Sequence, residues 1–462
     1  MKQSISGEDN LKRGAKLPLV TRANFKSDEE TSRNWFAGIE ETPVELVSEW
    51  ANEDASPFTP FGNEHDACAL ISVVNRTGIP TRNNITRTLE GLVKMSHRAG
   101  MVNGEGDGCG VMVDIPRALW QSKLAATGKD GGLAWRSDFW LGHVLVKRGV
   151  PAAEMMEKFA AEFEQQGFKV LYSQRGETVT AVLGPQGQAE EPTFWQIAGV
   201  TRLGQETVEP NRVLLQLHLG LEAAYPLQFA SLSFFTAIYK LRGSPDILDR
   251  YYPELNNPLL TSAATLGHSR YCTNTVSSFF RVQPFPVLGH NGEINTVARL
   301  QQEARMLGVH LADESSDSQD LSRLIETLTH EYGYGLLEAM EIAFPPIVNE
   351  IKQLEPDLQN LYVFLRQAFG PFAQGPAGII SRQDNECVFA VDALGLRPLW
   401  AGQLEDAYFF SSEKGVFAVE DMVADPRSLA PGEKVYVRLS GSEKENEVWN
   451  YARIQQEALK RL

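Results

Sequence analysis

One cysteine, one arginine and one Asn-Gly pair stand where their chemistry would exceed what packing needs. Cys68 directly precedes the apolar run ALISVVN, where a thiol is either a small core residue or a nucleophile. Arg270 lies in GHSRYCTNT among small and aromatic residues, so its guanidinium needs an anion, within the protein or on a ligand. Asn291 and Gly292, in GHNGEINT, form a plain turn or offer two N–H donors to a developing oxyanion.

A glycine-rich stretch and an acidic helix start are two further candidates. SHRAGMVNGEGDGCG spans residues 96–110, and its glycines let the backbone turn sharply and approach a ligand closely. A simple connecting loop is the alternative, and the glycine spacing excludes the dinucleotide and Walker fingerprints. ESSDSQDL, at 314–321, opens a helix in which Asp317 or Ser318 is by default the N-cap.

The composition is that of a folded globular protein and argues against several classes of partner. The 462 residues are 43% hydrophobic and 22% charged, a length that suggests two or three domains. A net charge of -16 provides no basic surface for nucleic acid and would be repelled by anionic membranes. No stretch approaches about 18 consecutive apolar residues and the start lacks signal-peptide character, so we expect a cytoplasmic protein.

The cysteine pattern indicates a reduced, intracellular chain. Cys68, Cys109, Cys272 and Cys387 are widely separated and include no C-x-x-C pair. This spacing argues against a zinc ribbon, a redox dithiol and an iron-sulfur centre. We therefore predict no metal site in this chain.

Hydrophobic periodicity predicts the elements that would position these residues. Strands are expected at ALISVV, GVMVDI, FKVLYS, RVLLQLHL, LSFFTAIY, HSRYCTN, AGIIS, CVFAVDA, PLWAG, AYFFSS and KVYVRL. Helices are expected at ITRTLEGLVKMSHR, PAAEMMEKFAAEFEQQG, INTVARLQQEARML, SQDLSRLIETLTH, LQNLYVFLRQAFG and NEVWNYARIQQEALKRL. Strands gather toward both ends of the chain with helices between them, which predicts an α+β fold of layered sheets covered by helices.

The first 67 residues differ in character from the rest. They hold 13 Asp and Glu against 7 Lys and Arg, and their apolar residues show poor periodicity. Such a segment is typical of a leader or a loosely packed extension. We treat residues 1–67 as a separate N-terminal leader.

Together the motifs point to one family. In chain order they are DAC, HR followed by GDG-x-G, H-x-R-Y-x-T-N-T, GHNGEINT, SDS and GLRP-L. This set resembles the glutaminase domain of the glutamate synthase large subunit, a class II glutamine amidotransferase of the N-terminal-nucleophile hydrolase superfamily. The resemblance implies a four-layer αββα sandwich over residues 68–440. Residues 441–462 would then form a C-terminal helix, a possible linker to a synthase domain or partner.

The resemblance also implies a nucleophile that is released by processing. In the family the nucleophile is an N-terminal cysteine, which here is Cys68 once the bond to Ala67 is cut. Residues 1–67 would then be a propeptide. A free α-amino group has a pKa of about 7.7 to 8.0, so it can relay the proton of the thiol without a histidine partner.

Roles for the other matched residues follow from the same resemblance. Arg270 would bind the α-carboxylate of L-glutamine and Asp317 its α-ammonium, while Asn291 and Gly292 would stabilise the oxyanion. The pocket would be supported by His97, Arg98, Gly106, Asp107 and Gly108. The predicted reaction is hydrolysis of glutamine to glutamate and ammonia through a cysteine thioester.

Partners and cofactors are expected outside this chain. Glutamate synthases continue into a region that carries FMN and an iron-sulfur cluster, so we expect those groups only on a synthase partner or on a missing downstream domain. Two alternatives remain: a non-catalytic glutamine sensor that keeps the fold, and an N-terminal-nucleophile hydrolase of another amide. Ala69, where relatives usually have glycine, favours the sensor.

Overall fold

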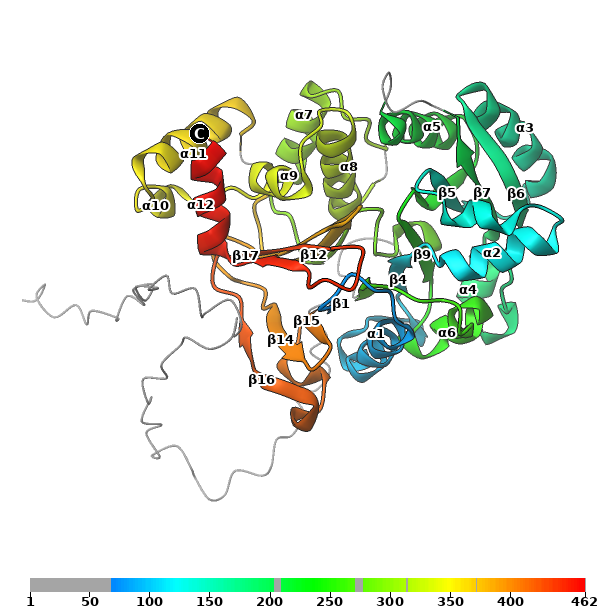
Figure 1. Cartoon of the computed structure of the whole chain (residues 1–462), viewed down its shortest axis with the longest axis horizontal. Coiled ribbons are helices and arrows are strands. Elements are labelled where there is room, and N and C mark those ends of the chain that lie inside the picture. Colours follow the sequence, from blue (N-terminus) through cyan, green and yellow to red (C-terminus); the bar gives the residue numbers. More distant parts are fainter. Residues whose placement is uncertain (1–67, 203–208, 271–276, 313–314, 371, 462) are drawn as a thin grey trace, which may run out of the picture. The chain divides into compact units, whose positions relative to one another are not determined.

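The computed structural model describes residues 68–202, 209–270, 277–312, 315–370 and 372–461 (Figure 1). The predicted leader at 1–67 and Cys272 lie outside the described residues. None of the helices within these ranges is long and apolar enough for a bilayer crossing.

Cys68 directly precedes the central strand of a seven-stranded antiparallel sheet. The strand order of this sheet is β16-β14-β15-β1-β10-β4-β9, so β1 lies at the centre and is buried along its whole length. The apolar alternation predicted here is therefore that of an interior strand with both faces covered. The strands are β1 (Ala69–Asn75), β4 (Cys109–Asp114), β9 (Thr236–Leu241), β10 (Ala264–Ser269), β14 (Trp400–Leu404), β15 (Ala407–Ser411) and β16 (Met422–Ser428).

A second antiparallel sheet has five strands in the order β11-β12-β13-β17-β18. It places the Asn-Gly pair at the end of its edge strand, with Asn291 opposite Gly378 and Gly292 opposite Ala377. The strands are β11 (Leu288–Gly292), β12 (Ala377–Gln383), β13 (Glu386–Val391), β17 (Lys434–Arg438) and β18 (Glu447–Trp449).

The two sheets pack face to face. Phe389 of β13 stacks on Phe410 of β15, with ring centroids 3.6 Å apart and ring planes inclined by 7°. A Cβ at Gly289 of β11 would lie 3.5 Å from the Leu70 side chain, which is ordinary contact distance. Nε2 of His268, from β10, lies 3.1 Å from the carbonyl oxygen of His290 in β11.

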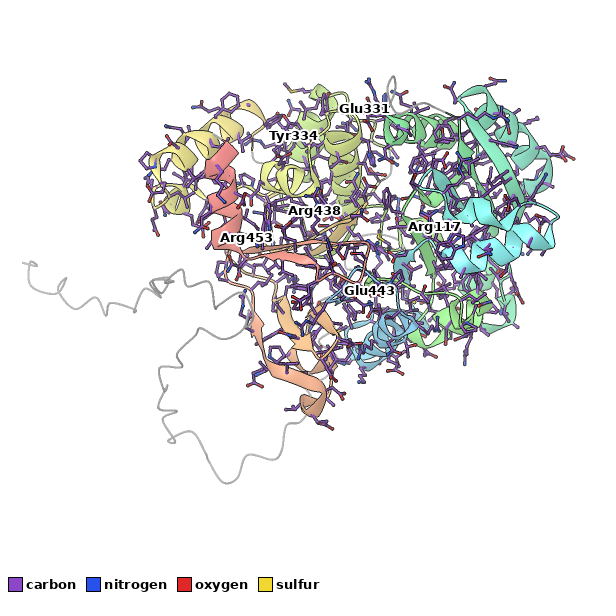
Figure 2. All side chains as sticks on the ribbon, in the orientation of Figure 1. Arg117, Glu331, Tyr334, Arg438, Glu443 and Arg453 are labelled. Atoms are coloured by element: carbon purple, nitrogen blue, oxygen red, sulfur yellow. The ribbon has the colours of Figure 1, made fainter. Side chains whose placement is uncertain are left out.

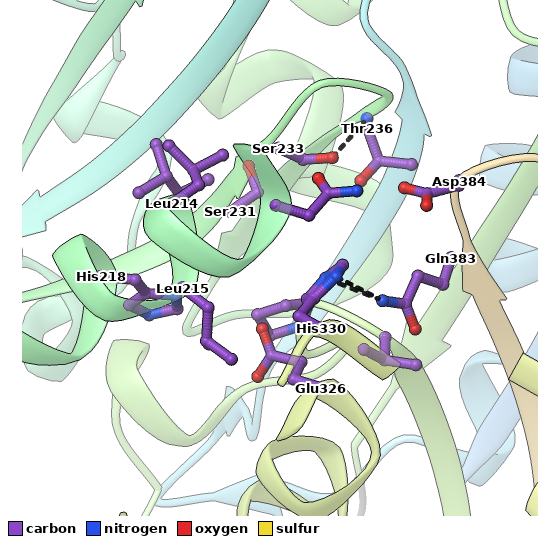
Figure 3. A pocket seen from close by; sticks show the side chains of 14 residues that line it. Leu214, Leu215, His218, Ser231, Ser233, Thr236, Glu326, His330, Gln383 and Asp384 are labelled. Atoms are coloured by element: carbon purple, nitrogen blue, oxygen red, sulfur yellow. Dashed lines mark hydrogen bonds between the residues drawn. The ribbon is translucent and has the colours of Figure 1, made fainter. Parts of the chain in front are cut away.

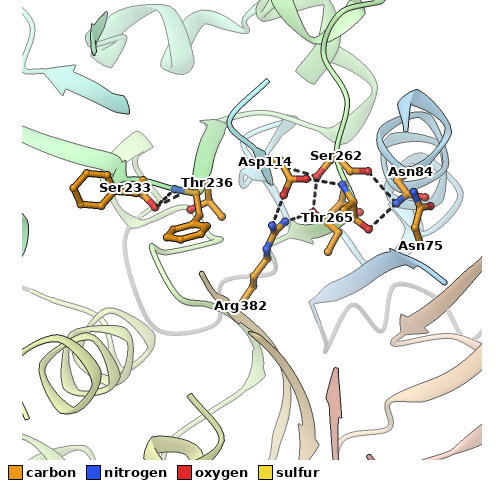
Figure 4. Close-up of polar contacts among 12 residues, drawn as sticks. Asn75, Asn84, Asp114, Ser233, Thr236, Ser262, Thr265 and Arg382 are labelled. Carbon is orange, nitrogen blue, oxygen red and sulfur yellow. Dashed lines mark hydrogen bonds and ion pairs between the residues drawn. The ribbon is translucent and has the colours of Figure 1, made fainter. Parts of the chain in front are cut away.

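Buried polar contacts also join the two sheets. The Arg382 guanidinium from β12 pairs with the Asp114 carboxylate of β4 and donates to the Ala264 carbonyl of β10 (Figure 4). The same cluster extends to the first helix, because Asn84 donates through its amide to the Ser262 carbonyl. These bonds satisfy polar groups that would otherwise be costly to bury.

Helices form the two outer layers (Figure 1). Helix α1 (Arg82–Lys94) lies on the outer face of the seven-stranded sheet, so closely that a Cβ at Gly91 would overlap Ile71. Leu321 and Ile325 of α8 share a core with Leu288 and Val388 on the outer face of the five-stranded sheet. The helices on this side are α7 (Val297–Met306), α8 (Asp317–His330), α9 (Leu336–Ala343), α10 (Val348–Ile351), α11 (Pro356–Ala368) and α12 (Tyr451–Arg461). The predicted four-layer αββα sandwich is confirmed.

A smaller four-stranded sheet, in the order β6-β7-β5-β8, has its own aromatic core around stacked Trp140 and Phe163. Its strands are β5 (Phe139–Val146), β6 (Phe168–Arg175), β7 (Thr193–Thr201) and β8 (Leu227–Ser233), and the helices of this region are α2 (Arg117–Ala126), α3 (Ala152–Gln165), α4 (Pro185–Glu190) and α5 (Pro210–Ala224). The remaining short elements are β2 (Met101–Val102), β3 (Glu105–Gly106) and α6 (Leu248–Tyr251). Side chains fill these layers throughout (Figure 2).

Several sequence predictions were wrong or incomplete. LSFFTAIY is not one strand, because it contains the end of β8, a turn and the start of β9. RVLLQLHL is part of helix α5, because its apolar residues suit either period and Pro210 starts a helix there. NEVWN is not helical: Glu447–Trp449 pairs with β17 as β18, and the helix begins only at Tyr451. The strands β5 and β7, which form the middle of the smaller sheet, were not predicted.

We expect Arg382→Met to lower the free energy of unfolding by about 3 to 5 kcal/mol, because it leaves the Asp114 carboxylate without its buried partner. Urea denaturation measures this change. The double variant Arg382→Met/Asp114→Asn should recover part of the loss, since no uncompensated charge remains. If the single variant lost less than about 1 kcal/mol of unfolding free energy, the Arg382–Asp114 pair would not be a buried ion pair that stabilises the contact between the sheets.

Candidate active site

The backbone at Cys68 is held by Arg98 and by Ser412, the residue that follows β15. Its carbonyl oxygen accepts from Nε of Arg98 at 3.4 Å and from Oγ of Ser412 at 3.5 Å. Two residues on, the Leu70 N–H donates to Ser412 Oγ at 2.9 Å, and the Ser412 N–H donates to the Leu70 carbonyl at 3.0 Å. Cys68 is 8% exposed, so it directly precedes β1 in a nearly buried position.

Strand alternation gives the direction of the Cys68 side chain. Leu70 faces the second sheet, where its methyl groups lie at contact distance from the positions that a Cβ would take at Gly289 and Gly378. Residues two apart in a strand share a face, so the same alternation, continued to the residue before β1, would direct Cys68 to that side. Gly378 is the strand partner of Asn291, which brings the thiol and the Asn-Gly pair to one region between the sheets.

Asn291 is buried without partners. It is 1% exposed, and neither its amide oxygen nor its amide nitrogen makes a hydrogen bond within the described residues. Burying such a group unsatisfied costs about 1 to 3 kcal/mol, and a structure that keeps one needs a reason for it. A ligand carbonyl that accepts from the amide nitrogen supplies that reason.

Gly292 can only be a glycine. Its φ is +136°, and a Cβ there would lie 1.8 Å from the Pro376 carbonyl oxygen. The neighbouring strand therefore approaches the backbone at this point more closely than any side chain would allow. The plain-turn alternative does not describe this pair, because Asn291 and Gly292 are the paired end of strand β11.

Arg270 and the glycine-rich stretch lie together. The Arg270 N–H donates to the Gly108 carbonyl at 2.7 Å, and Nε of Arg270 lies 3.9 Å from the Asp107 carboxylate. Both side chains are buried, so the internal anion that the sequence left open for Arg270 is Asp107. Gly106 and Gly108 allow this packing, since a Cβ at either would overlap its neighbours.

Asp317 lies beside the Asn-Gly pair, at the start of α8. The N-cap is Ser316, which forms a capping box with Gln319, so the predicted cap at Asp317 or Ser318 was wrong. Instead the Asp317 carboxylate accepts from the Ile294 N–H at 3.0 Å. This bond holds the residues that follow Gly292 against the helix.

His97 and Arg98 lie on the other side of Cys68, in a short 3-10 turn (Ser96–Arg98). Both contact one carboxylate oxygen of Glu413, His97 through Nε2 at 2.6 Å and Arg98 through Nη1 at 3.2 Å. The His97 side chain is 62% exposed, whereas Arg98 also reaches the Cys68 carbonyl. Arg98 therefore contacts the backbone of Cys68 directly, and His97 is linked to Arg98 through Glu413.

Two other described cysteines are unsuited to nucleophilic chemistry. Cys109 and Cys387 are fully buried. Burial raises the pKa of the Cys109 thiol far above its usual range and raises that of Cys387 to about 12. Both thiols stay protonated near neutral pH, and only the thiolate attacks.

Sequence reasoning missed Ser412 and Glu413, which hold Cys68 and its neighbours. Their polar character at the end of a strand carries no signal that links them to a residue more than 340 positions away. The sequence also led to no prediction for His290, whose Nδ1 lies 2.9 Å from Oγ of Ser318. No group of three or more potential metal ligands occurs in the described part of the chain.

A separate small cavity of about 30 Å³ lies between α5, β8 and α8 (Figure 3). Its polar lining includes His218, Glu326, His330 and Asp384, and none of the predicted site residues contributes to it. The cavity is therefore distinct from the site around Cys68.

Comparisons with known proteins identify the family of this chain. The family model described as glutamine amidotransferases class-II matches residues 68–461. The NADH glutamate synthase of Saccharomyces cerevisiae is 27% identical over 90% of this chain, and the NADPH glutamate synthase large chain of Bacillus subtilis is 28% identical over 81%. This chain spans only 21% and 26% of those two relatives.

Among solved structures, a glutamine phosphoribosylpyrophosphate amidotransferase from B. subtilis, complexed with ADP and GMP, is 14% identical with a TM-score of 0.40. The match covers 83% of this chain and 49% of that chain.

We expect Ser412→Ala to lower the free energy of unfolding by about 1 to 3 kcal/mol, because the Leu70 N–H loses its side-chain acceptor in a buried strand. Ser381→Ala is the matched control, since this equally buried hydroxyl only donates to a strand carbonyl. Urea denaturation of both variants decides the point. Equal losses would show that Ser412 does no more than an ordinary buried serine.

Acid should destabilise the fold through His268. Burial lowers its pKa from 6.5 to about 3, so the neutral form is favoured in the folded chain. Below pH 6.5 the unfolded chain binds more protons, and the contribution of His268 to stability is lost as the pH falls toward 3. His268→Gln should make the fall of unfolding free energy between about pH 6 and 4 shallower by up to about 1.4 kcal/mol per pH unit.

Denaturant unfolding at several pH values measures this slope. His310→Gln serves as the control, because His310 is exposed. An unchanged slope in His268→Gln would contradict the neutral buried histidine.

Proposed function

The chain belongs to the class II glutamine amidotransferase family, and on this premise we propose that it hydrolyses L-glutamine to glutamate and ammonia, with Cys68 as nucleophile. The observation that carries the proposal is the buried, unpartnered amide of Asn291, next to a Gly292 that no other residue could replace. This pair lies at the end of the strand that faces β1, which Cys68 directly precedes. A sensor that only bound glutamine would have little use for oxyanion donors.

The first step would be attack by the Cys68 sulfur on the side-chain amide carbon of glutamine. Cleavage between Ala67 and Cys68 would free an α-amino group whose pKa, about 7.7 to 8.0, suits it to take the thiol proton. As the S–C bond forms, the carbonyl oxygen becomes negative. Asn291 Nδ2 and the Gly292 N–H would donate to it, and loss of one such donor typically costs about 2.7 to 4 kcal/mol of transition-state stabilisation.

Collapse of this intermediate would break the C–N bond. The α-ammonium returns its proton to the leaving nitrogen, ammonia departs, and a γ-glutamyl thioester remains on Cys68. Water then attacks the thioester with the same amine as base. Glutamate leaves and the thiol is restored.

Two charged residues would hold the amino-acid end of the substrate. Arg270 would bind the α-carboxylate, with Asp107 holding the guanidinium in place from within the protein. Asp317 would contact the α-ammonium while it keeps its bond to the Ile294 N–H. The Gly108 carbonyl, in the glycine-rich stretch, accepts from the Arg270 N–H and so holds the backbone of this residue.

The ammonia would be used by a synthase partner or by a further domain. The curated relatives are glutamate synthases, and this chain corresponds to about a quarter or less of their length. We place FMN and the iron-sulfur cluster, which the resemblance implies, on that partner. The reaction proposed for this chain needs neither group.

Exposure of the purified chain to a glutamine-mimicking diazoketone should label Cys68. Intact-mass measurement is expected to show a chain that begins at Cys68 and carries one adduct, and the untreated chain should release ammonia from glutamine in preference to asparagine. Cys68→Ser should lose both adduct and turnover, because it removes the thiolate. Cys109→Ser is the control and should keep both, since that thiol is buried and protonated.

A full-length chain without adduct or turnover would overturn the proposed function and favour the glutamine sensor. Preference for another amide would favour a different hydrolase of the same superfamily.

A further inference from the structure

A buried carboxylate next to the Asn-Gly pair has no part in the mechanism above. Asp392 follows β13 directly and is 6% exposed. Its two oxygens accept four backbone N–H groups: Leu394 on Oδ1, and Ala377, Leu396 and Arg397 on Oδ2, at 2.9 to 3.3 Å. A charged acceptor shared by four donors is among the stronger hydrogen-bonding arrangements in proteins.

One set of these hydrogen bonds holds Ala377. The Asp392 carboxylate accepts from the Ala377 N–H at 3.0 Å, while the Asp392 N–H donates to the Ala377 carbonyl at 2.7 Å. Ala377 is therefore held through both of its backbone polar groups by a single residue.

Ala377 in turn sets the position of Gly292. The two residues are partners in the β11–β12 pair. The preceding carbonyl, of Pro376, lies where a Cβ of Gly292 would be and accepts from the Glu293 N–H at 3.0 Å. A shift of the Pro376–Ala377 peptide would consequently move the Gly292 backbone.

The other hydrogen bonds of the Asp392 carboxylate hold the loop that follows β13. Leu396 and Arg397 are fixed by the carboxylate, and the Arg397 Cβ lies 3.8 Å from where a Cβ of Gly378 would be. Gly378 is the partner of Asn291. Asp392 thus bonds the strand partner of Gly292 directly, and the loop that it holds lies beside the strand partner of Asn291.

We propose that Asp392 is a positioning residue for oxyanion stabilisation, because it fixes Ala377, the strand partner of Gly292, and the loop that lies beside Gly378, the strand partner of Asn291. The inference rests on the proposed function, since it concerns the oxyanion of that reaction. The competing explanation is purely structural: Asp392 also caps its own turn, where the Gly395 N–H donates to the Asp392 carbonyl. The two explanations differ in which kinetic constant they change.

Asp392→Asn keeps the size of the side chain but turns one acceptor into an NH₂ group that must face backbone N–H donors. Oxyanion donors act in the transition state and little in the ground state, so kcat for glutamine should fall about 10- to 100-fold while KM stays within about threefold. Alkylation of Cys68 by iodoacetamide forms no oxyanion. Its rate should therefore be unchanged in the variant.

Glu433→Gln is the matched control. Glu433 is also buried, accepts from the Ala430 N–H at 2.7 Å within a neighbouring turn and pairs with Arg427. Its side chain makes no bond to Ala377 or to the loop at 394–397 among the described contacts. This variant should lose stability yet keep the wild-type kcat.

An unchanged kcat in Asp392→Asn would overturn the inference while leaving the proposed function intact. So would a rise in KM or a fall in the iodoacetamide rate that matches the fall in kcat, because the whole site would then be disturbed. If Asp392→Asn does not fold, Asp392→Ser, with one short acceptor, is judged by the same three readouts. A wild-type chain without glutaminase activity would overturn the proposed function itself.

Discussion

The packing of two antiparallel sheets against each other is the interaction on which the rest of the structure depends. The inner faces meet through Leu70, Phe389 and Phe410, all withdrawn from water. Because side chains alternate along a strand, this packing also fixes the direction of Cys68. The same contact that forms the core therefore places β1, which follows Cys68 directly, against the edge strand of the other sheet.

Burying so many polar groups in this region requires that they compensate one another. Arg382 is neutralised by Asp114, and Arg270 by Asp107. The segment that contains Asn291 and Gly292 lies between two further carboxylates: Asp317 accepts from Ile294 on one side, and Asp392 accepts from Ala377 on the other. The buried amide of Asn291 makes no hydrogen bond within the described residues, and several neighbouring polar atoms, among them both carboxylate oxygens of Asp107, share this state.

Burial also makes the environments of the Cys68 and Cys109 thiols different. Cys109 lies in β4, two strands from Cys68 in the same sheet, yet its pKa is raised because it is fully enclosed. Cys68 retains some exposure at the end of its strand, and its backbone is held by Ser412 and Arg98. Position within one sheet thus distinguishes a structural cysteine from a candidate nucleophile of the same residue type.

The sequence by itself determined the types of the site residues, their order along the chain and the layered α+β fold. Motifs such as GHNGEINT and the alternation of ALISVV are local, and local pattern is what a single chain records. The strand predicted for RVLLQLHL is instead part of helix α5, because a short apolar run suits a strand or a helix until the packing around it is known.

Only the tertiary structure decided which residues meet. Arg270 faces Asp107, Ser412 holds Leu70, and Asp392 holds Ala377, because strands far apart in the chain become neighbours in the sheets. No spacing in the sequence encodes these pairs. They follow from which faces the sheets bury against each other, and that depends on the free energy of the whole core rather than on any local segment.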